Sequence, residues 1–304
     1  MKRAAFAVAA LAASSVFLNA QAQQVDSALT PYQRGSGVSG TLNSVGSDTM
    51  NNMMTLWAET FRKFYASVNI QVEGKGSSTA PPALIAGTSQ LGPMSRQMRA
   101  TEIDQFEAKY GYKPTELKTS YDALAVYVNK DNPIEKLTLA QVEAIFGKTR
   151  KRGYKQNITT WGQLGLTGDW AKRPISLYGR NSASGTYGFF KEHVLKNKDF
   201  SARVQTLPGT AAVVNAVAKD PNGIGYGGAA YAKGVRDLGM KKAADSPAVL
   251  PVAATVKDGS YPLSRPLFFY LRKSPSGDTK KFVDWVLSAE GQKLAVEVGY
   301  FPLN

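Results

Sequence analysis

The hydrophobic and polar positions of this chain follow two different periods, and the change between them predicts an α/β protein. Short apolar or alternating runs, such as NIQVEG (69–74) and YDALAVYVNK (121–130), are typical of strands. Between Met50 and Phe64 the apolar residues recur every three or four positions, which is typical of a helix. Because strands and helices follow one another, we expect mostly parallel sheets with ligands at the carboxyl ends of the strands.

The same patterns place the other elements and suggest where two helices begin. Thr101 with Asp104 and Thr138 with Gln141 resemble capping boxes. We expect further elements in the following segments: strands at 174–179, 222–228, 249–256 and 265–273, a helix at 210–218, and two helices between Gly277 and Gly299.

A chain of 304 residues is long enough for two domains. We expect the strong buried strand at 121–130 to lie at a domain crossover. The prediction is a domain I made of 41–126 plus 256–304 and a domain II made of 127–255. Two chain crossings, near Val126 and near Thr255, would then form a hinge.

One stretch, YGRNSASGTYGFF (178–190), joins hydroxyls, a glycine and an arginine at the predicted start of a helix. A helix N-terminus has unpaired N–H groups and a partial positive charge, and both favour an anion. Arg180 adds a five-donor fork that suits a tetrahedral oxyanion. The alternative is an ordinary N-cap, in which Ser184 or Thr186 satisfies the first turn of a surface helix.

Three more turns with hydroxyl groups stand where a predicted strand gives way to a helix. They are Ser47-Asp48-Thr49, the turn with Ser77 and Ser78, and the turn with Ser95 and Arg96. Several such turns at the same kind of junction are less expected by chance than one. Together with Arg180, Ser184, Gly185 and Thr186, they indicate a single binding site for an oxyanion.

The N-terminal segment predicts export. Lys2 and Arg3 precede an apolar run at 4–18, and Ala20-Gln21-Ala22 is a small-x-small cleavage site, so 1–22 reads as a signal peptide. A transmembrane anchor is the competing interpretation, but the apolar run is short for a span. Residues 23–40 are polar and rich in Gly and Ser, which predicts a flexible leader. We expect no membrane insertion of the mature chain.

The composition excludes several kinds of site. There is no cysteine, so disulfides, thiolate metal sites and a lipid-modified N-terminal cysteine are excluded. Loss of Lys2 and Arg3 would lower the formal net charge from +14 to +12, an excess that favours anionic partners. The basic residues are scattered, and the dense run at 148–152 is interpreted as a solvated loop, so no nucleic acid is expected.

The sequence contains few of the residue patterns that enzymes of this kind require. The one histidine, His193, lies two helical turns beyond Thr186 beside Phe189 and Phe190, and no G-x-S-x-G or S-x-x-K pattern is present. No metal or other cofactor is expected. A phosphatase is therefore the weaker alternative to a binding protein, and a role in adhesion without transport is a second alternative.

With these turns identified, about 40–304 resembles the periplasmic phosphate-binding proteins of ABC transporters (the PstS type). The specific element is Arg-x-x-x-Ser-Gly-Thr, here Arg180, Ser184, Gly185 and Thr186. Weaker elements are the turns Gly46-Ser47-Asp48-Thr49 and Gly76-Ser77-Ser78. The resemblance implies the two-domain type II periplasmic binding protein fold, with Thr49 and Ser77 as ligands from one domain and the Arg180 motif as ligands from the other.

The resemblance also implies a function and a location. It implies a periplasmic monomer, not lipid-anchored, that delivers inorganic phosphate to an ABC transporter permease. Two positions depart from the family pattern. Ser95 and Arg96 stand where known members carry a ligand aspartate, and Ser182 stands where another aspartate follows the arginine. Asp48 is the one carboxylate inside these turns, so it is our candidate acceptor for the proton of phosphate. The alternative is that Asp48 caps the helix that begins at Thr49.

Overall fold

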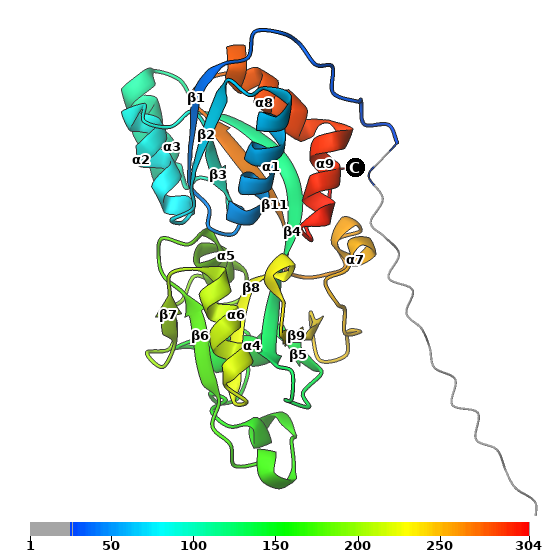
Figure 1. Ribbon diagram of the computed structural model, residues 1–304. Coiled ribbons are helices and arrows are strands. Elements are labelled where there is room, and N and C mark those ends of the chain that lie inside the picture. Colours follow the sequence, from blue (N-terminus) through cyan, green and yellow to red (C-terminus); the bar gives the residue numbers. More distant parts are fainter. Residues whose placement is uncertain (1–24, 26, 304) are drawn as a thin grey trace, which may run out of the picture.

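The protein is described by a computed structural model that covers residues 25 and 27–303. The predicted signal peptide at 1–22 lies outside these residues. The described chain forms two lobes stacked end to end, with one long strand, β4 (Thr115–Asn129), running through both (Figure 1). No helix within the described residues is both long enough and apolar enough to span a membrane.

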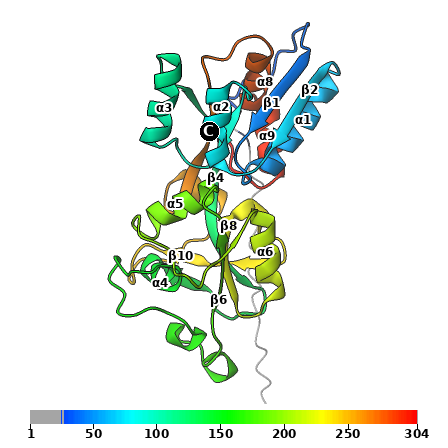
Figure 2. The same cartoon turned by 90° about the vertical axis from the view of Figure 1, so that its left-hand side faces the viewer.

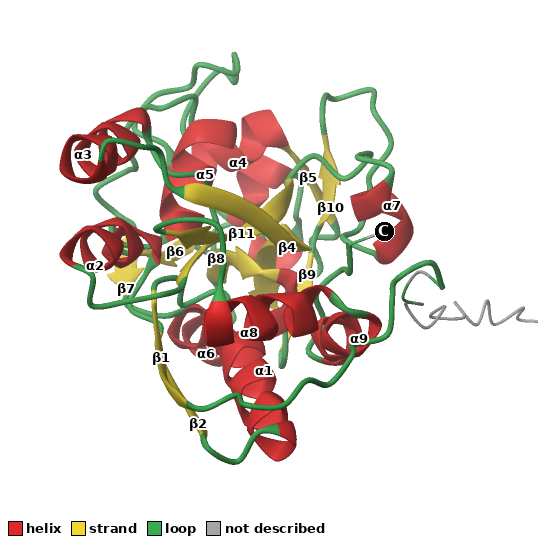
Figure 3. Ribbon diagram, turned by 90° about the horizontal axis from the view of Figure 1, so that it is seen from above, coloured by secondary structure: helices red, strands yellow, loops and turns green. Residues whose placement is uncertain are grey.

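The first lobe, here lobe I, contains the early and the late parts of the chain. Its helices gather in two groups, α2 with α3 and α1 with α8 and α9, on different sides of the strands (Figure 3). Its elements are β1 (Gly40–Val45), α1 (Asn51–Phe64), β2 (Val68–Glu73), α2 (Ala80–Ala86), β3 (Gly92–Met94), α3 (Ala100–Tyr110), the first part of β4, β11 (Ser264–Leu271), α8 (Gly277–Leu287) and α9 (Ala289–Glu297).

The second lobe, lobe II, contains the middle of the chain. Helix α5 lies at its upper edge, facing lobe I (Figure 2). Its elements are the rest of β4, β5 (Lys136–Thr138), α4 (Leu139–Phe146), β6 (Ser176–Arg180), α5 (Gly185–His193), β7 (Gln205–Leu207), α6 (Thr210–Lys219), β8 (Gly223–Gly228), β9 (Val235–Asp237), β10 (Gly239–Lys241) and α7 (Ala253–Lys257).

One sheet links the lobes, in the order β3-β11-β4-β8-β6-β7, with β9 also on β4. Strand β4 pairs with β11 over 115–123 and with β8 over 124–128. These pairs are antiparallel, whereas β6 pairs in parallel with β7 and β8, and β1 pairs in parallel with β2. The α/β class is confirmed, and the sheet is mixed because the shared strand β4 runs against its neighbours.

Each lobe has its own apolar core. In lobe I, Phe61 packs edge-on against Phe282 with ring centroids 5.2 Å apart, and Trp57 and Trp285 are fully buried beside them. In lobe II, Phe190 stacks on Tyr226 at 4.0 Å. Because each lobe buries its own aromatic residues, the surface between the lobes is free to carry polar groups.

Two local predictions were wrong, and one was confirmed. The segment at 249–256 is not a strand: Val249 makes one bridge to Met240, and α7 begins at Ala253. Pro251 in this segment lacks the N–H that a strand ladder needs. At the start of α3, Arg99 N donates to Glu102 Oε2 at 2.8 Å and no side chain caps the helix, so Thr101 with Asp104 is not a capping box.

The capping box of α4 is as predicted. Gln141 N donates to Thr138 Oγ1 at 3.1 Å, and Thr138 N donates to Gln141 Oε1 at 2.8 Å.

The polar segment before β1 contacts lobe I at several points. Tyr32 N donates to Glu290 Oε2 at 2.9 Å, and Arg34 lies over the ring of Phe64 at 3.9 Å. Val38 is buried, with 6% of its surface exposed. Described residues of the predicted leader therefore contact α1 and α9 in this structure.

Candidate anion-binding site

The predicted turns meet where the two lobes face each other. Thr49, between β1 and α1, and Thr186, at the start of α5, have their Oγ1 atoms 2.7 Å apart and are both buried. Ser77 Oγ and Ser95 Oγ lie 3.3 Å apart on the lobe I side. We call Thr49, Ser77, Ser95, Arg180, Gly185 and Thr186 the cradle.

Gly185 lets the backbone of α5 approach these hydroxyls. A Cβ at this position would collide with Ser77 Oγ and would lie 2.5 Å from Ser95 Oγ. Gly185 is also the first residue of α5, so its N–H is one of the first-turn N–H groups that have no hydrogen-bond acceptor within the helix. The helix dipole and these N–H groups make the wall formed by lobe II electropositive.

Ser184 is the N-cap of α5, because its Oγ accepts a hydrogen bond from Tyr187 N at 3.3 Å. The capping alternative that the sequence left open thus holds for Ser184. It does not hold for Thr186, whose Oγ1 faces Thr49. Capping fixes the direction of the helix start, so Ser184 orders the cradle even while its oxygen serves the helix.

Arg180, at the end of β6, is 1% exposed and forms an ion pair with Asp48 across the lobes, with Nη2 3.0 Å from Oδ2. Its Nη1 donates to Thr210 Oγ1 at 2.5 Å. Burial lowers the pKa of the guanidinium, and the neighbouring carboxylate of Asp48 opposes that shift. Nε of Arg180 is buried and has no hydrogen-bond partner in the described part of the chain.

Asp48 does not cap the helix that follows it. Helix α1 begins at Asn51 without a side-chain cap. The Asp48 carboxylate instead reaches α6 in the other lobe, where Oδ2 accepts from Thr210 N at 2.9 Å and from Thr210 Oγ1 at 3.1 Å. Tyr231 Oη of lobe II donates to the Asp48 carbonyl at 3.1 Å. The Asp48 turn is therefore a contact between the lobes.

A second arginine, Arg265, and its partner Asp122 were not predicted from the sequence. Arg265 Nε and Nη2 donate to Asp122 Oδ2 at 3.0 and 2.7 Å. Arg265 Nη2 also donates to Thr186 Oγ1 at 2.9 Å, and Nη1 donates to the Ser95 carbonyl at 3.0 Å. The one signal in the sequence is that both charges interrupt strongly apolar strands, where charged residues are rare unless paired.

Ser78 and Arg96 lie at the edge of the cradle. The Arg96 guanidinium donates to both oxygens of Glu102, at 2.7 and 2.6 Å, and to Ser78 Oγ at 3.1 Å. Burial acts to raise the pKa of Glu102, but hydrogen bonds from Arg96 and Arg99 lower it below its ordinary value. Ser78 N donates to the Ala183 carbonyl at 3.0 Å, so this edge also joins the lobes.

Ser47 serves its own turn. Its Oγ accepts from Met50 N at 3.4 Å, and its N–H donates to the Pro93 carbonyl at 2.8 Å. Ser47 is thus placed to hold the backbone that presents Thr49.

The cradle presents mainly hydrogen-bond donors. Hydroxyls from both lobes, the start of α5 and two buried arginines converge on one place, a donor set that suits a compact oxyanion. His193 stacks on Phe189 at 3.9 Å at the far end of α5. Among the described residues no group of three or more acidic, histidine or cysteine side chains could hold a metal.

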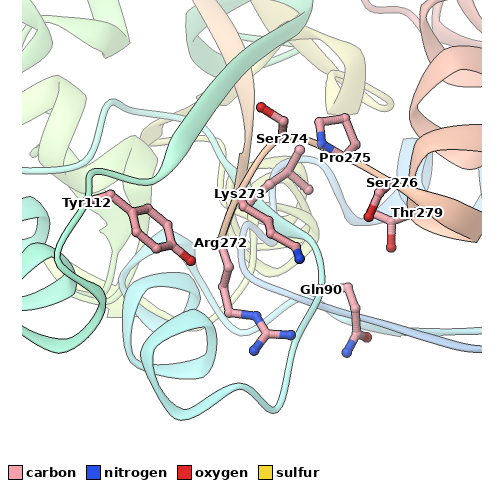
Figure 4. Close-up of a pocket in the computed structure, with 9 residues that line it drawn as sticks. Gln90, Tyr112, Arg272, Lys273, Ser274, Pro275, Ser276 and Thr279 are labelled. Atoms are coloured by element: carbon pink, nitrogen blue, oxygen red, sulfur yellow. The ribbon is translucent and has the colours of Figure 1, made fainter.

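Another pocket lies at the opposite end of β11 from Arg265 (Figure 4). Its volume is about 230 Å³, and it is lined by Gln90, Tyr112, Leu271, Arg272, Lys273, Ser274, Pro275, Ser276 and Thr279. None of the cradle residues belongs to it.

Comparison with known proteins places the chain in a family. A model of the PBP superfamily domain matches 32–290. The phosphate-binding protein PstS of Pseudomonas aeruginosa is 51% identical over 284 residues, which cover 92% of this chain and 88% of that protein. The protein SphX of Synechococcus elongatus is 30% identical, with 92% of this chain and 82% of that protein covered.

Solved structures agree in fold. A Clostridium perfringens protein, described as a phosphate ABC transporter substrate-binding protein with bound phosphate, is 26% identical with a TM-score of 0.74, covering 87% of this chain and 100% of that chain. An ABC-type phosphate transport receptor from Vibrio cholerae, 23% identical, has a TM-score of 0.66 over 86% of this chain and 100% of that chain. The chain therefore has the type II periplasmic binding protein fold and belongs to the PBP superfamily, among the PstS-type phosphate-binding proteins.

Proposed function

We propose that this protein binds inorganic phosphate between its lobes and delivers it to an ABC transporter. The observation that carries the proposal is the cradle, in which Thr49 of lobe I and Thr186 of lobe II have their hydroxyls 2.7 Å apart beside two buried arginines. The relative from Pseudomonas aeruginosa, which is named a phosphate-binding protein, supports it. The family consists of transport binding proteins and not of enzymes.

In this proposal both lobes supply ligands, so the anion favours the arrangement in which they are closed. Lobe I contributes Thr49, Ser77 and Ser95, and lobe II contributes Arg180, the N–H of Gly185, and Thr186. The lobes are proposed to move about the crossings near Val126 and Thr255, with domain I at 41–126 plus 256–304 and domain II at 127–255.

We further propose that the protein works in the periplasm with a membrane transporter. Residues 1–22 would direct export to the periplasm, and the absence of cysteine from the sequence excludes a lipid-modified cysteine as anchor. The mature protein would act as a monomer with a transporter permease as its partner.

Calorimetric titration of the mature protein with phosphate, arsenate and sulfate tests the function. We expect phosphate to bind, and Arg180→Ala to weaken it by roughly 2–5 kcal/mol, the range for truncating one partner of a buried charge pair. Arg62→Ala, which removes an equal charge from the exposed face of α1, is the matched control. A parent protein that binds none of the three anions would overturn the proposal, as would an Arg180→Ala variant that binds like the parent.

A further inference from the structure

A second pocket, of about 680 Å³, lies between the lobes on the other side of Arg265 from the cradle. Lobe I lines it with Arg96, Gln97, Met98, Arg99 and Lys118, and lobe II lines it with the part of α5 and its end that runs from Tyr187 to Asn197. Arg265 belongs to its lining and also donates to Thr186. Arg265, which is only 2% exposed, therefore contacts both the pocket and the cradle.

The floor of this pocket is apolar. Met98, Phe189 and Phe268 belong to its lining and are buried, and Pro266 also lines it. The guanidinium of Arg265 lies over the Phe189 ring at 5.2 Å, so this ring is already part of a cationic and aromatic wall. A concave site of several hundred Å³ at a domain interface, with apolar walls and a few polar groups, is typical of small-molecule sites.

The rim of the pocket carries more positive than negative side chains. Three lining cations have carboxylate partners: Arg96 with Glu102, Lys191 with Asp199, and Arg265 with Asp122. Arg99 and Lys118 are exposed in the lining and form no salt bridge to the described residues. The lining contains one carboxylate, Glu192. The surplus calls for a ligand with one or two negative charges.

Arg96 gives a second, independent indication. It is 8% exposed, and its two terminal nitrogens are used by Glu102, Ser78 and the Gln97 carbonyl. Its Nε, by contrast, is buried without a hydrogen-bond partner in the described part of the chain. That nitrogen lies on the side of Gly188 in the opposite lobe, 3.6 Å from where a Cβ of Gly188 would stand. A buried donor of this kind calls for an acceptor.

We propose that this pocket binds a small organic anion with an apolar ring or chain, the charge on the Arg99 and Lys118 rim and the apolar part on the Phe189 and Phe268 floor. The walls come from both lobes, so the ligand binds the closed arrangement better than an open one. Phosphate and the organic anion must then strengthen each other's binding by the same factor, because coupling between two sites is reciprocal. This coupling rests on the proposed function.

The test uses the fluorescent aromatic sulfonate 8-anilinonaphthalene-1-sulfonate as the probe, titrated into the mature protein with and without saturating phosphate. We expect several-fold tighter probe binding with phosphate. Arg99→Gln/Lys118→Gln should weaken the probe about 3- to 10-fold in the presence of phosphate, the sum of two partly exposed charge interactions. Arg62→Gln/Lys113→Gln removes the same charge from exposed positions outside the pocket and should bind like the parent.

Three results would overturn the pocket: probe affinity that does not depend on Arg99 and Lys118, equal binding of the uncharged analogue N-phenyl-1-naphthylamine, or probe binding that phosphate leaves unchanged or weakens. Calorimetry of phosphate with the parent separates the two proposals. If the parent binds phosphate but fails these tests, only the proposal of the organic-anion pocket is overturned. If the parent binds no phosphate, the proposed function is overturned, and so is the coupling between the two sites.

Discussion

Arg265 and Asp122 are directly opposite each other in the antiparallel pair of β11 and β4, and their side chains form an ion pair at 2.7 Å with 2% and 1% of their surfaces exposed. The same guanidinium donates to Thr186 at the start of α5. One pair of strand neighbours thus ties the shared strand β4 to the lobe II wall of the cradle. Burial raises the pKa of Asp122, and the charge of Arg265 opposes that shift.

We predict that Arg265→Gln lowers the free energy of unfolding by about 3–5 kcal/mol, because it leaves Asp122 as an unpaired buried acid. It should also weaken phosphate binding, since Thr186 loses its donor. The double variant Arg265→Gln/Asp122→Asn should recover most of the stability without recovering the phosphate affinity. Urea unfolding and calorimetry on the three proteins give both quantities. Recovery of both by the double variant would show that the pair serves folding alone.

We predict that Gly185→Ala makes closure less favourable while leaving each lobe folded. Its new Cβ would meet Ser77 and Ser95 only when the lobes are together, because those serines belong to lobe I. Overpacking of this kind costs about 1–3 kcal/mol, which corresponds to roughly 5- to 150-fold weaker phosphate binding. At a phosphate concentration just sufficient to saturate the parent, small-angle scattering should show a smaller reduction of the radius of gyration for the variant than for the parent.

The control for this prediction is Gly35→Ala, because a Cβ on Gly35 would meet no atom within 4 Å. That variant should close like the parent. A Gly185→Ala variant that contracts normally with phosphate would mean that the cradle does not require the close approach of α5.

The parts of the site that were predictable carry their signal locally. A strand, a glycine and hydroxyl turn, and a helix follow one another within a dozen residues around Ser184, so the sequence is enough to place the start of α5. The partners of charged side chains are not local. Asp122 and Arg265 are 143 residues apart and meet through strand register, and Asp48 caps a helix that begins 162 residues later in the chain.

Arg96 and the segment around Pro251 illustrate two other limits. Arg96 as an anion ligand stays a prediction, made because it follows Ser95 in a predicted cradle turn. The sequence did not show that a carboxylate six residues later, Glu102, accepts from both of its terminal nitrogens. The valines at 249–256 favour a strand in composition, whereas among the described residues this segment forms a single β-bridge, from Val249 to Met240. In both segments the outcome depended on which neighbour was available, which a single sequence does not contain.

The carboxyl group of Asp237, in β9, predicts a pH dependence of stability. Burial raises its pKa to about 7, and its Oδ1 is buried without a hydrogen-bond partner in the described part of the chain. Since the pKa of an aspartate in an unfolded chain is about 3.9, the folded state binds the extra proton between these values. The stability that this proton contributes is complete below about pH 4 and is lost as the pH rises through about 7.

Asp237→Asn keeps the shape and removes the titration, so the variant should gain stability relative to the parent as the pH rises from 5 to 8. Thermal unfolding of both proteins across this range measures the difference. A constant difference would show that Asp237 ionises in the folded protein as easily as in an unfolded chain. Asp245→Asn, at an exposed position, should follow the parent throughout.

The role of Asp48 can be decided by comparing phosphate with sulfate, because phosphate carries a proton near neutral pH and sulfate does not. A carboxylate that accepts this proton favours phosphate and disfavours sulfate, whose oxygens can only accept. A carboxylate that orients Arg180 favours neither. The structure gives Asp48 Oδ2 three donors, Arg180 Nη2 and two from Thr210, and places Oδ1 3.1 Å from where a Cβ of Gly209 would stand.

We therefore predict that Asp48→Asn changes the affinities for phosphate and sulfate by the same factor, so that their ratio stays within about threefold of the parent's. The amide oxygen can still accept from Thr210, so the variant should fold normally. If Asp48 were the acceptor of the phosphate proton, the ratio would instead fall by about 5- to 150-fold, the cost of a lost buried hydrogen-bond partner. Competition calorimetry with sulfate against phosphate measures the ratio, and Asp245→Asn controls for the change in net charge. If the ratio falls in Asp48→Asn and not in Asp245→Asn, Asp48 is the side chain that discriminates between the two anions. If the ratio is unchanged, Asp48 is the group that orients Arg180.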